Sequence, residues 1–249
     1  MSAGTEARLR RELAAVYRLV ALYGMTDLIF THISMRLPGD DPRFLLNPYG
    51  LLFDEITASN LVTVGSDGHL IGESEYSVNP AGFVIHSAVH AARDDAHCVL
   101  HTHTRAGCAV AASGEGLLPL NQMSMEFYNR IGYHDYEGVA LSLSERQRLV
   151  DDLGSHHAMI LRNHGLLTVG RTPAEAFLRM FYLNRACEIQ VAAQASGSLV
   201  IPPPEVCERS ARQLTGQDTG DDFVDENAVV LAWSALLRRL DRECPDYAN

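Results

Sequence analysis

The sequence predicts an α/β fold, because segments with helical periodicity alternate with short apolar runs that are typical of strands. Apolar side chains recur at helical spacing over residues 5–24. The apolar runs 159–161 and 166–170 flank the turn sequence RNHG (162–165), which predicts two adjacent strands. The motif TPAE (172–175) then combines a helix cap, a proline at the first helical position and a capping-box glutamate. We find no internal repeat.

The same reasoning places the other elements in chain order. We expect extended chain over 42–64, a turn at 65–68, a helix over 80–93, a strand over 98–100, a helix over 105–113, loop and strand over 114–142, a helix from Ser144 with a capping box, and a helix over 172–195. The segment 30–34 is interpreted as a polar loop.

A proline-rich linker at 201–204 follows the long helix, so we divide the chain into a domain over 1–197 and a tail over 198–249. The tail should contain a short helix, an acidic turn at 216–222 and a last helix near 224–243. Because the tail is too small for a core of its own, we expect it to dock on the main domain or on a neighbouring subunit.

Composition excludes several classes of partner. The 249 residues carry a net charge of −11, which argues against nucleic acid, because phosphate binding needs a basic surface. The charged N-terminal segment lacks the apolar core of a secretion signal, and no apolar run has the roughly 18 residues of a membrane helix. The five cysteines are odd in number and form no CxxC pair, which indicates reduced thiols. We therefore expect a cytoplasmic protein.

His101 and His103 follow a short apolar strand and are separated by one threonine. Residues i and i+2 of a strand point to the same face, so both imidazoles can converge on one metal ion. A catalytic metal site needs a third ligand and an open position. His164, in the turn between two predicted strands, is the best candidate for that third ligand.

The chain has 11 histidines, so a chance pair is a real alternative. His86 and His90 are spaced i, i+4 on one predicted helix, but serine stands where the HExxH motif has glutamate. We interpret these two as partly buried packing or hydrogen-bonding residues. To the adjacent pair His156 and His157 we assign no role.

Four stretches together resemble the class II aldolase/adducin family: GFVIHSA (82–88), HTHT (101–104), YHDY (133–136) and RNHGLL (162–167). The likeness runs in a consistent order from about residue 8 to residue 195. The resemblance implies a three-layer α/β/α sandwich around a central, largely antiparallel sheet. It also implies homotetramers with active sites between subunits.

The family's enzymes bind one divalent metal through three histidines, and the resemblance puts those positions on His101, His103 and His164. We expect zinc first, with iron(II) or manganese as alternatives. The substrate should be a small molecule.

This chain departs from the family's sugar-phosphate aldolases. Their catalytic glutamate corresponds to Gly82, and their phosphate-binding positions correspond to Thr31-His32 and Pro80-Ala81. Gly50, in NPYG (47–50), keeps the pattern of the second phosphate loop. These departures argue against sugar-phosphate cleavage by the usual route and against a phosphorylated substrate. Tyr49, Gly50 and Gly82 are the candidate substrate-binding residues.

A proton shuttle must replace the missing glutamate, and histidine and tyrosine can serve. The resemblance places His32 near the metal, and Tyr128 lies in a loop where relatives carry acid/base residues. His134 lies in the same region, and Glu126 could supply a carboxylate there. The alternatives are structural: His32 as a turn cap and Tyr128 as a half-buried packing residue.

Three functions stay open. The first is a metal-dependent lyase of the aldolase type, acting on a small non-phosphorylated hydroxy acid, keto acid or sugar-like carbonyl compound. The second is a non-haem iron(II), dioxygen-dependent oxygenase that decarboxylates a hydroxy acid, because three neutral imidazoles with open positions also suit iron(II). The third is a non-catalytic, adducin-like assembly protein, ranked last because all three ligand positions keep histidine.

Overall fold

The computed structural model describes residues 3–39, 41–138, 145–217 and 228–249. Within these residues eight strands form one sheet. The strands are β1 His32–Leu37, β2 Arg43–Leu46, β3 Val62–Gly65, β4 Leu70–Ile71, β5 Cys98–Thr102, β6 Gly132–His134, β7 Ala158–Leu161 and β8 Gly165–Gly170. Their spatial order is β4-β3-β2-β1-β5-β8-β7-β6, and every neighbouring pair is antiparallel except β6 with β7.

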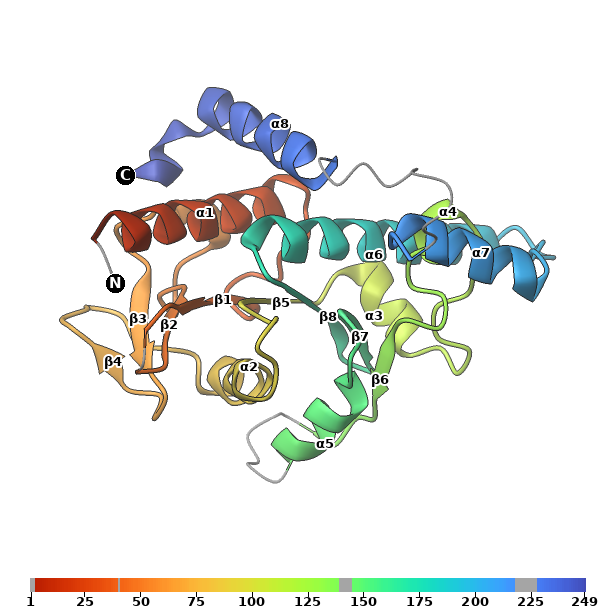
Figure 1. The fold of residues 1–249 in the computed structure, drawn as a ribbon, viewed down its shortest axis with the longest axis horizontal. Helices are drawn as coiled ribbons and strands as arrows, with labels where there is room; N and C mark the ends of the chain where they lie inside the picture. The colour runs from red at the N-terminus through yellow and green to blue at the C-terminus, as the bar shows by residue number, and fades with distance from the viewer. Residues whose placement is uncertain (1–2, 40, 139–144, 218–227) are drawn as a thin grey trace.

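Helices cover both faces of the sheet and produce three layers (Figure 1). The helices are α1 Ala3–Leu22, η1 Phe53–Glu55, α2 Pro80–Ala92, α3 Arg105–Ala111, α4 Gln122–Met125, α5 Glu145–Leu153, α6 Pro173–Gln194, α7 Pro204–Leu214, α8 Ala228–Glu243 and η2 Pro245–Ala248. Helices α1 and α6 lie on one face, and α2 and α5 lie on the other (Figure 1). The predicted α/β sandwich with a largely antiparallel sheet is confirmed.

Alternation along the strands supplies a separate core for each face. Ile33 of β1 and Leu100 of β5 pack in the core beneath α1 and α6. Val99 of β5 packs on the opposite face with Val89 of α2 and Leu149 of α5. The central strands are therefore buried on both sides.

The interpretation of 30–34 as a polar loop was wrong, because His32–Leu37 forms the central strand β1. Ile33 points to the core beneath α1, whereas His32 and Ser34 point to α2. Both polar side chains are buried, at 3% and 0% exposed, and are hydrogen-bonded to histidines of α2. The sequence HISMRL (32–37) alternates polar and apolar residues with the period of a strand, so the loop interpretation overlooked a signal that the sequence contains.

The other expected elements appear with small shifts. The extended region 42–64 resolves into β2 and β3 with η1 between them. Three short elements, strand β4, the single-turn helix α4 and the C-terminal helix η2, had no sequence prediction. The predicted cap at Ser144, most of the acidic turn and the first residues of the last helix lie outside the described residues.

The C-terminal segment packs on the helical layer of α1 and α6 (Figure 1). Helix α8 contacts both helices, and η2 contacts α1. Tyr247 of η2 is fully buried, and Arg18 of α1 pairs with Asp246 at 2.7 Å. Helix α7 packs against α4 instead.

None of the helices in the described part of the chain is long and apolar enough to cross a lipid bilayer.

Tyr17 of α1 fixes the end of β1 that carries His32. The hydrogen-bonded pairing between β1 and β2 ends at Met35. Beyond that point the fully buried Tyr17 hydroxyl bonds the backbone groups that the pairing leaves open. It accepts the backbone N–H groups of Ile33 and Asn47 at 2.9 and 3.1 Å and donates to the carbonyl oxygen of Ile33. This hydroxyl therefore satisfies backbone groups that would otherwise be buried without partners.

We predict that Tyr17→Phe lowers the free energy of unfolding by about 2 kcal/mol, because it leaves two buried N–H groups unpaired. Tyr23→Phe is the matched control, since the Tyr23 hydroxyl accepts one long bond from Arg239 at 3.3 Å. Urea denaturation measures both variants. Equal stability of the two would contradict the assigned role of Tyr17.

Candidate metal centre

Three histidines converge at one end of β5, two from the end of β5 and one from the turn between β7 and the neighbouring strand β8. His101 is the fourth residue of β5, His103 follows that strand, and His164 lies in the turn between β7 and β8. Their candidate ligand atoms all lie within 4.8 Å of one another. We call this set the triad.

Two backbone features permit the close approach. Asn163 has φ of +56°, a left-handed conformation that asparagine tolerates and that turns the chain at His164. A Cβ on Gly165 would lie 2.4 Å from the carbonyl oxygen of Thr102 and 3.1 Å from the ring of His103. Glycine at 165 therefore lets the β7–β8 turn approach the end of β5 closely enough to bring the three histidines together.

Hydrogen bonds to the outer nitrogens orient two of the rings. Nδ1 of His101 donates to the carbonyl oxygen of Leu166 at 2.9 Å, and Nδ1 of His103 donates to the Asp27 carboxylate at 2.9 Å. Neither acceptor carries a hydrogen to give back, so each neutral ring has its hydrogen on Nδ1 and a lone pair on Nε2. The two Nε2 atoms are 2.8 Å apart. Two lone pairs at that separation repel each other unless a cation lies between them.

Burial favours the neutral, metal-binding form of two of the three histidines, His101 and His164. Desolvation lowers the pKa of His101 well below its usual value, with further lowering from the neighbouring histidines. Desolvation also lowers the pKa of His164 to about 4. Neutral imidazoles with fixed outer hydrogen bonds are typical ligands of zinc and of iron(II), and three protein ligands leave a coordination position free.

His32 lies beside the triad and occupies the space in front of Gly82. It pairs with His101 across the β1–β5 ladder, and their ring centroids are 5.2 Å apart. A Cβ on Gly82 would lie 2.4 Å from Cδ2 and 2.8 Å from Nε2 of His32. The His32 ring thus fills the place toward which a side chain at position 82 would point.

The segment of Tyr49 and Gly50 lies next to the start of α2. The N–H of Tyr49 donates to the carbonyl oxygen of Ser77 at 2.9 Å, three residues before Pro80. Gly50 has φ of +110°, which requires glycine. The fold therefore brings the candidate substrate-binding positions 49, 50 and 82 to the same end of α2.

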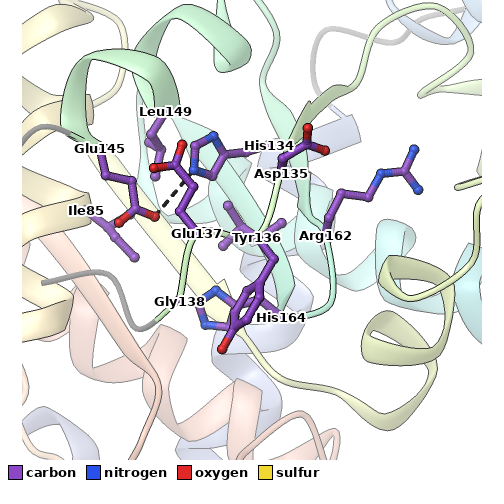
Figure 2. A pocket seen from close by; sticks show the side chains of 11 residues that line it. Ile85, His134, Asp135, Tyr136, Glu137, Gly138, Glu145, Leu149, Arg162 and His164 are labelled. Atoms are coloured by element: carbon purple, nitrogen blue, oxygen red, sulfur yellow. Dashed lines mark hydrogen bonds and ion pairs between the residues drawn. The ribbon is translucent and has the colours of Figure 1, made fainter. Parts of the chain in front are cut away.

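His134 belongs to a small cavity that adjoins the triad. The cavity has a volume of about 10 Å³, room for about one water molecule, and His164 lines it together with His134 and Glu145 (Figure 2). His134 bonds the Asp152 carboxylate through Nδ1 at 2.7 Å and lies 3.4 Å from the Glu145 carboxylate through Nε2.

Among the described residues no hydrogen bond or ring contact joins Tyr128 to the triad. The Tyr128 N–H donates to the carbonyl oxygen of Met125 in α4, and its carbonyl oxygen accepts from the Arg130 guanidinium, which also pairs with Glu208 of α7. Glu126 lines a groove beside α4, α6 and α7, where burial raises its pKa to about 7. The role of Tyr128 stays a prediction.

The expectation that His86 and His90 are partly buried was wrong, because each is 1% exposed. Their nitrogens are engaged with His32, with Ser34 and with the carbonyl oxygen of Ala96. Polar partners on β1, which the sequence did not reveal, allow both rings to be buried.

Sequence reasoning also missed Asp27 and Glu145. Asp27 lies in the segment between α1 and β1, and no local motif marks it as a partner of His103. Glu145 begins α5, where an acidic residue is common for helix stability alone. Their contacts arise from tertiary structure.

Residues 11–191 match the family model described as the class II aldolase and adducin N-terminal domain. A putative aldolase class 2 protein of Caulobacter vibrioides is 52% identical, covering 98% of this chain and 93% of that protein. The α-adducin of Rattus norvegicus is 44% identical over 77% of this chain and 26% of the adducin. The structure of L-fuculose 1-phosphate aldolase from Glaciozyma antarctica superposes with a TM-score of 0.83 at 28% identity, covering 98% and 92% of the two chains.

The chain therefore belongs to the class II aldolase and adducin family, as its motifs indicate.

We predict that Gly82→Ala destabilises the protein by about 1–3 kcal/mol, because the new methyl group displaces the His32 ring. Gly114→Ala is the control, since a Cβ there meets nothing within 4 Å. In a His32→Ala background the cost of Gly82→Ala should largely disappear, a coupling that chemical denaturation of the four proteins measures. Additive effects would contradict the contact.

We predict that His101→Ala lowers bound divalent metal from one ion per chain to none, while the far-ultraviolet circular dichroism stays that of a folded protein. His69→Ala, at an exposed position, should keep full metal content. Elemental analysis of protein purified without chelator gives the result. Stoichiometric metal in His101→Ala would remove this residue from the ligand set.

Proposed function

We propose that the chain is a divalent-metal-dependent lyase of the aldolase type, acting on a small non-phosphorylated hydroxy acid, keto acid or sugar-like carbonyl compound. The observation that carries this proposal is the convergence of three histidines whose ligand atoms lie within 4.8 Å of one another, beside a further buried histidine. His101, His103 and His164 would each supply one nitrogen to one metal ion per subunit, with zinc as the first choice and iron(II) or manganese as alternatives.

A bound divalent ion would supply Lewis-acid polarisation of a substrate carbonyl oxygen. The sequence contains no lysine, so activation of a carbonyl through a Schiff base is not open to this chain. The protein's own task is then to bind the substrate and to move a proton.

His32 is the proposed proton acceptor. Its ring is 3% exposed, and burial disfavours the charged form, so the ring is neutral and offers a lone pair. In cleavage of a β-hydroxy carbonyl compound, a base removes the hydroxyl proton as the adjacent carbon–carbon bond breaks. His32 can serve in place of a carboxylate at position 82, because its ring fills the space in front of Gly82.

The surroundings of the triad disfavour a phosphorylated substrate. Phosphate binding needs a cation or several free N–H donors, and the neutral His32 stands at one of the family's phosphate positions. Arg162, which lines the cavity beside His164, is already engaged by the Ser113 carbonyl oxygen and the Tyr133 ring. Tyr49, Gly50 and Gly82 would contact an uncharged or carboxylate-bearing substrate instead.

The site is proposed to lie near a subunit interface of a homotetramer. Leu28 and Phe30 are 66% and 49% exposed in the segment that joins Asp27 to His32. Tyr136, in the cavity wall beside His164, is 55% exposed. An apolar rim of this kind supports contact with another chain. Tyr128 would then act on the site of a neighbouring subunit.

Two alternatives have support. The identity of 44% to an α-adducin favours a non-catalytic assembly role on the same fold. Three neutral imidazoles suit iron(II) as well as zinc, which keeps a dioxygen-dependent decarboxylating oxygenase as a candidate. Elemental analysis followed by a panel of hydroxy and keto acids and sugars, under air and under nitrogen, separates the three. Zinc or manganese with oxygen-independent cleavage supports the lyase, iron with oxygen uptake the oxygenase, and no metal the assembly protein.

We predict that His32→Asn lowers kcat on the substrate found in that panel about 100-fold, the usual contribution of one general acid or base. Metal content should be unchanged. His69→Asn, the same substitution on the surface, should keep the wild-type rate. Full turnover by His32→Asn would exclude His32 from proton transfer.

A further inference from the structure

A continuous hydrogen-bonded chain of buried side chains runs from His32 away from the triad. Nδ1 of His32 lies 2.9 Å from Nε2 of His86, and Nδ1 of His86 lies 2.7 Å from the Ser34 hydroxyl. The same hydroxyl lies 2.6 Å from Nε2 of His90, whose Nδ1 lies 2.7 Å from the carbonyl oxygen of Ala96. The four side chains are between 0% and 3% exposed.

Two backbone periodicities build this chain. His32 and Ser34 are two residues apart on β1 and face the same side of the sheet. His86 and His90 are four residues apart on α2, so both lie on one face of that helix, and this face packs on the same side of the sheet. Phe44 stacks on the far ring, His90, with centroids 4.8 Å apart and an interplanar angle of 21°.

The hydrogen positions along the chain follow from its end. The three rings are each at most 3% exposed, and burial disfavours a charged imidazole, so all three are neutral. Burial lowers the pKa of His90 to about 3 and that of His86 well below its usual value. The Ala96 carbonyl oxygen has no hydrogen, so His90 must donate to it from Nδ1. Nε2 of His90 is then bare and accepts the single hydroxyl hydrogen of Ser34.

The same reasoning assigns the hydrogens between Ser34 and His32. Ser34, having donated its hydrogen, can only accept from Nδ1 of His86. Nε2 of His86 is then bare and accepts from Nδ1 of His32. This leaves Nε2 of His32 without a hydrogen, and among the described residues nothing bonds it.

We propose that Ser34, His86 and His90 are positioning residues that hold His32 in the tautomer with its hydrogen on Nδ1 and an unprotonated Nε2 beside Gly82 and the triad. The catalytic consequence rests on the proposed function, since a proton acceptor needs that lone pair. The hydrogen-bonded network ends on a carbonyl oxygen, which neither gives nor takes a proton. This end fixes the direction of the hydrogen bonds, and the network does not conduct protons to solvent.

The proposal fixes which ring nitrogen of each histidine carries the hydrogen, so the tautomer is the readout. Nitrogen-15 NMR of histidine-labelled protein, as purified, distinguishes a protonated ring nitrogen from a bare one. The His32 signals are those lost in His32→Asn. We expect hydrogen on Nδ1 and a bare Nε2 for His32, His86 and His90 in the wild type.

Variants should reverse that direction. In His90→Phe the Ser34 hydroxyl loses its acceptor and can donate to Nδ1 of His86, so we expect the hydrogen of His32 to move to Nε2. Ser34→Ala should release the same constraint and populate that tautomer. Ser87→Ala is the matched control, because Ser87 is a buried serine of α2 that does not belong to the His32–His86–Ser34–His90 network. Its hydroxyl donates to the Val84 carbonyl oxygen and accepts from Arg146. This variant should leave the His32 signals unchanged.

A hydrogen on Nε2 of His32 in the wild type would overturn the proposal, as would an Nδ1 tautomer that persists in both His90→Phe and Ser34→Ala. The measurement does not involve turnover. If the tautomers are as expected but His32→Asn turns over normally, the positioning inference stands and the proton-transfer role fails. If His32→Asn is inactive but the wild-type tautomer is the opposite one, the positioning inference fails alone.

Discussion

The pairing of β1 with β5 is the constraint on which the site depends. Its register places His32 opposite His101 and Ser34 opposite Val99. A slip of one residue would turn both polar side chains of β1 into the apolar core beneath α1. The register is secured from both faces, by Ile33 in that core and by the α2 histidines that bond His32 and Ser34. The same contacts that make the strand stable thus deliver an imidazole to the edge of the triad.

One electrostatic rule orders the histidines on both sides of that pairing. In each case the outer nitrogen donates, directly or through other side chains, to a group that can only accept a hydrogen bond. His101 donates to the Leu166 carbonyl oxygen and His103 to the Asp27 carboxylate. The network that includes His32 ends on the Ala96 carbonyl oxygen. Burial keeps His101 and His32 neutral, so their hydrogens lie on the outer nitrogens and their lone pairs on the inner ones. The fold therefore gathers bare nitrogens at one place, which is the arrangement a cation stabilises.

Local sequence motifs predicted the histidine-bearing strand end, the β7–β8 turn and the start of α6, because neighbouring residues determine each of these structures. The HTHT and RNHG stretches have their own strand-end and turn signals, and helix α6 begins with the predicted Thr172 cap, whose hydroxyl accepts from Glu175. Strand β1 was missed although HISMRL alternates polar and apolar residues with the period of a strand. What the alternation does not reveal is that the polar side chains of His32 and Ser34 are buried against α2 and not exposed to water. Asp27 and the roles of His86 and His90 depend on which helix faces which strand, and a single sequence does not contain that information. The absence of glutamate at position 82 was visible in the sequence, but the reason that glycine fits there, the ring of His32, required the structure.

Diffraction from crystals of protein purified without chelator, with data collected on either side of the metal absorption edge, tests the central claim most directly. The account predicts one anomalous peak per chain, bonded by Nε2 of His101, Nε2 of His103 and a ring nitrogen of His164, with the His32 ring alongside. Rings that point apart, or packed side chains filling the space between them, would contradict it and leave a fold without a metal centre.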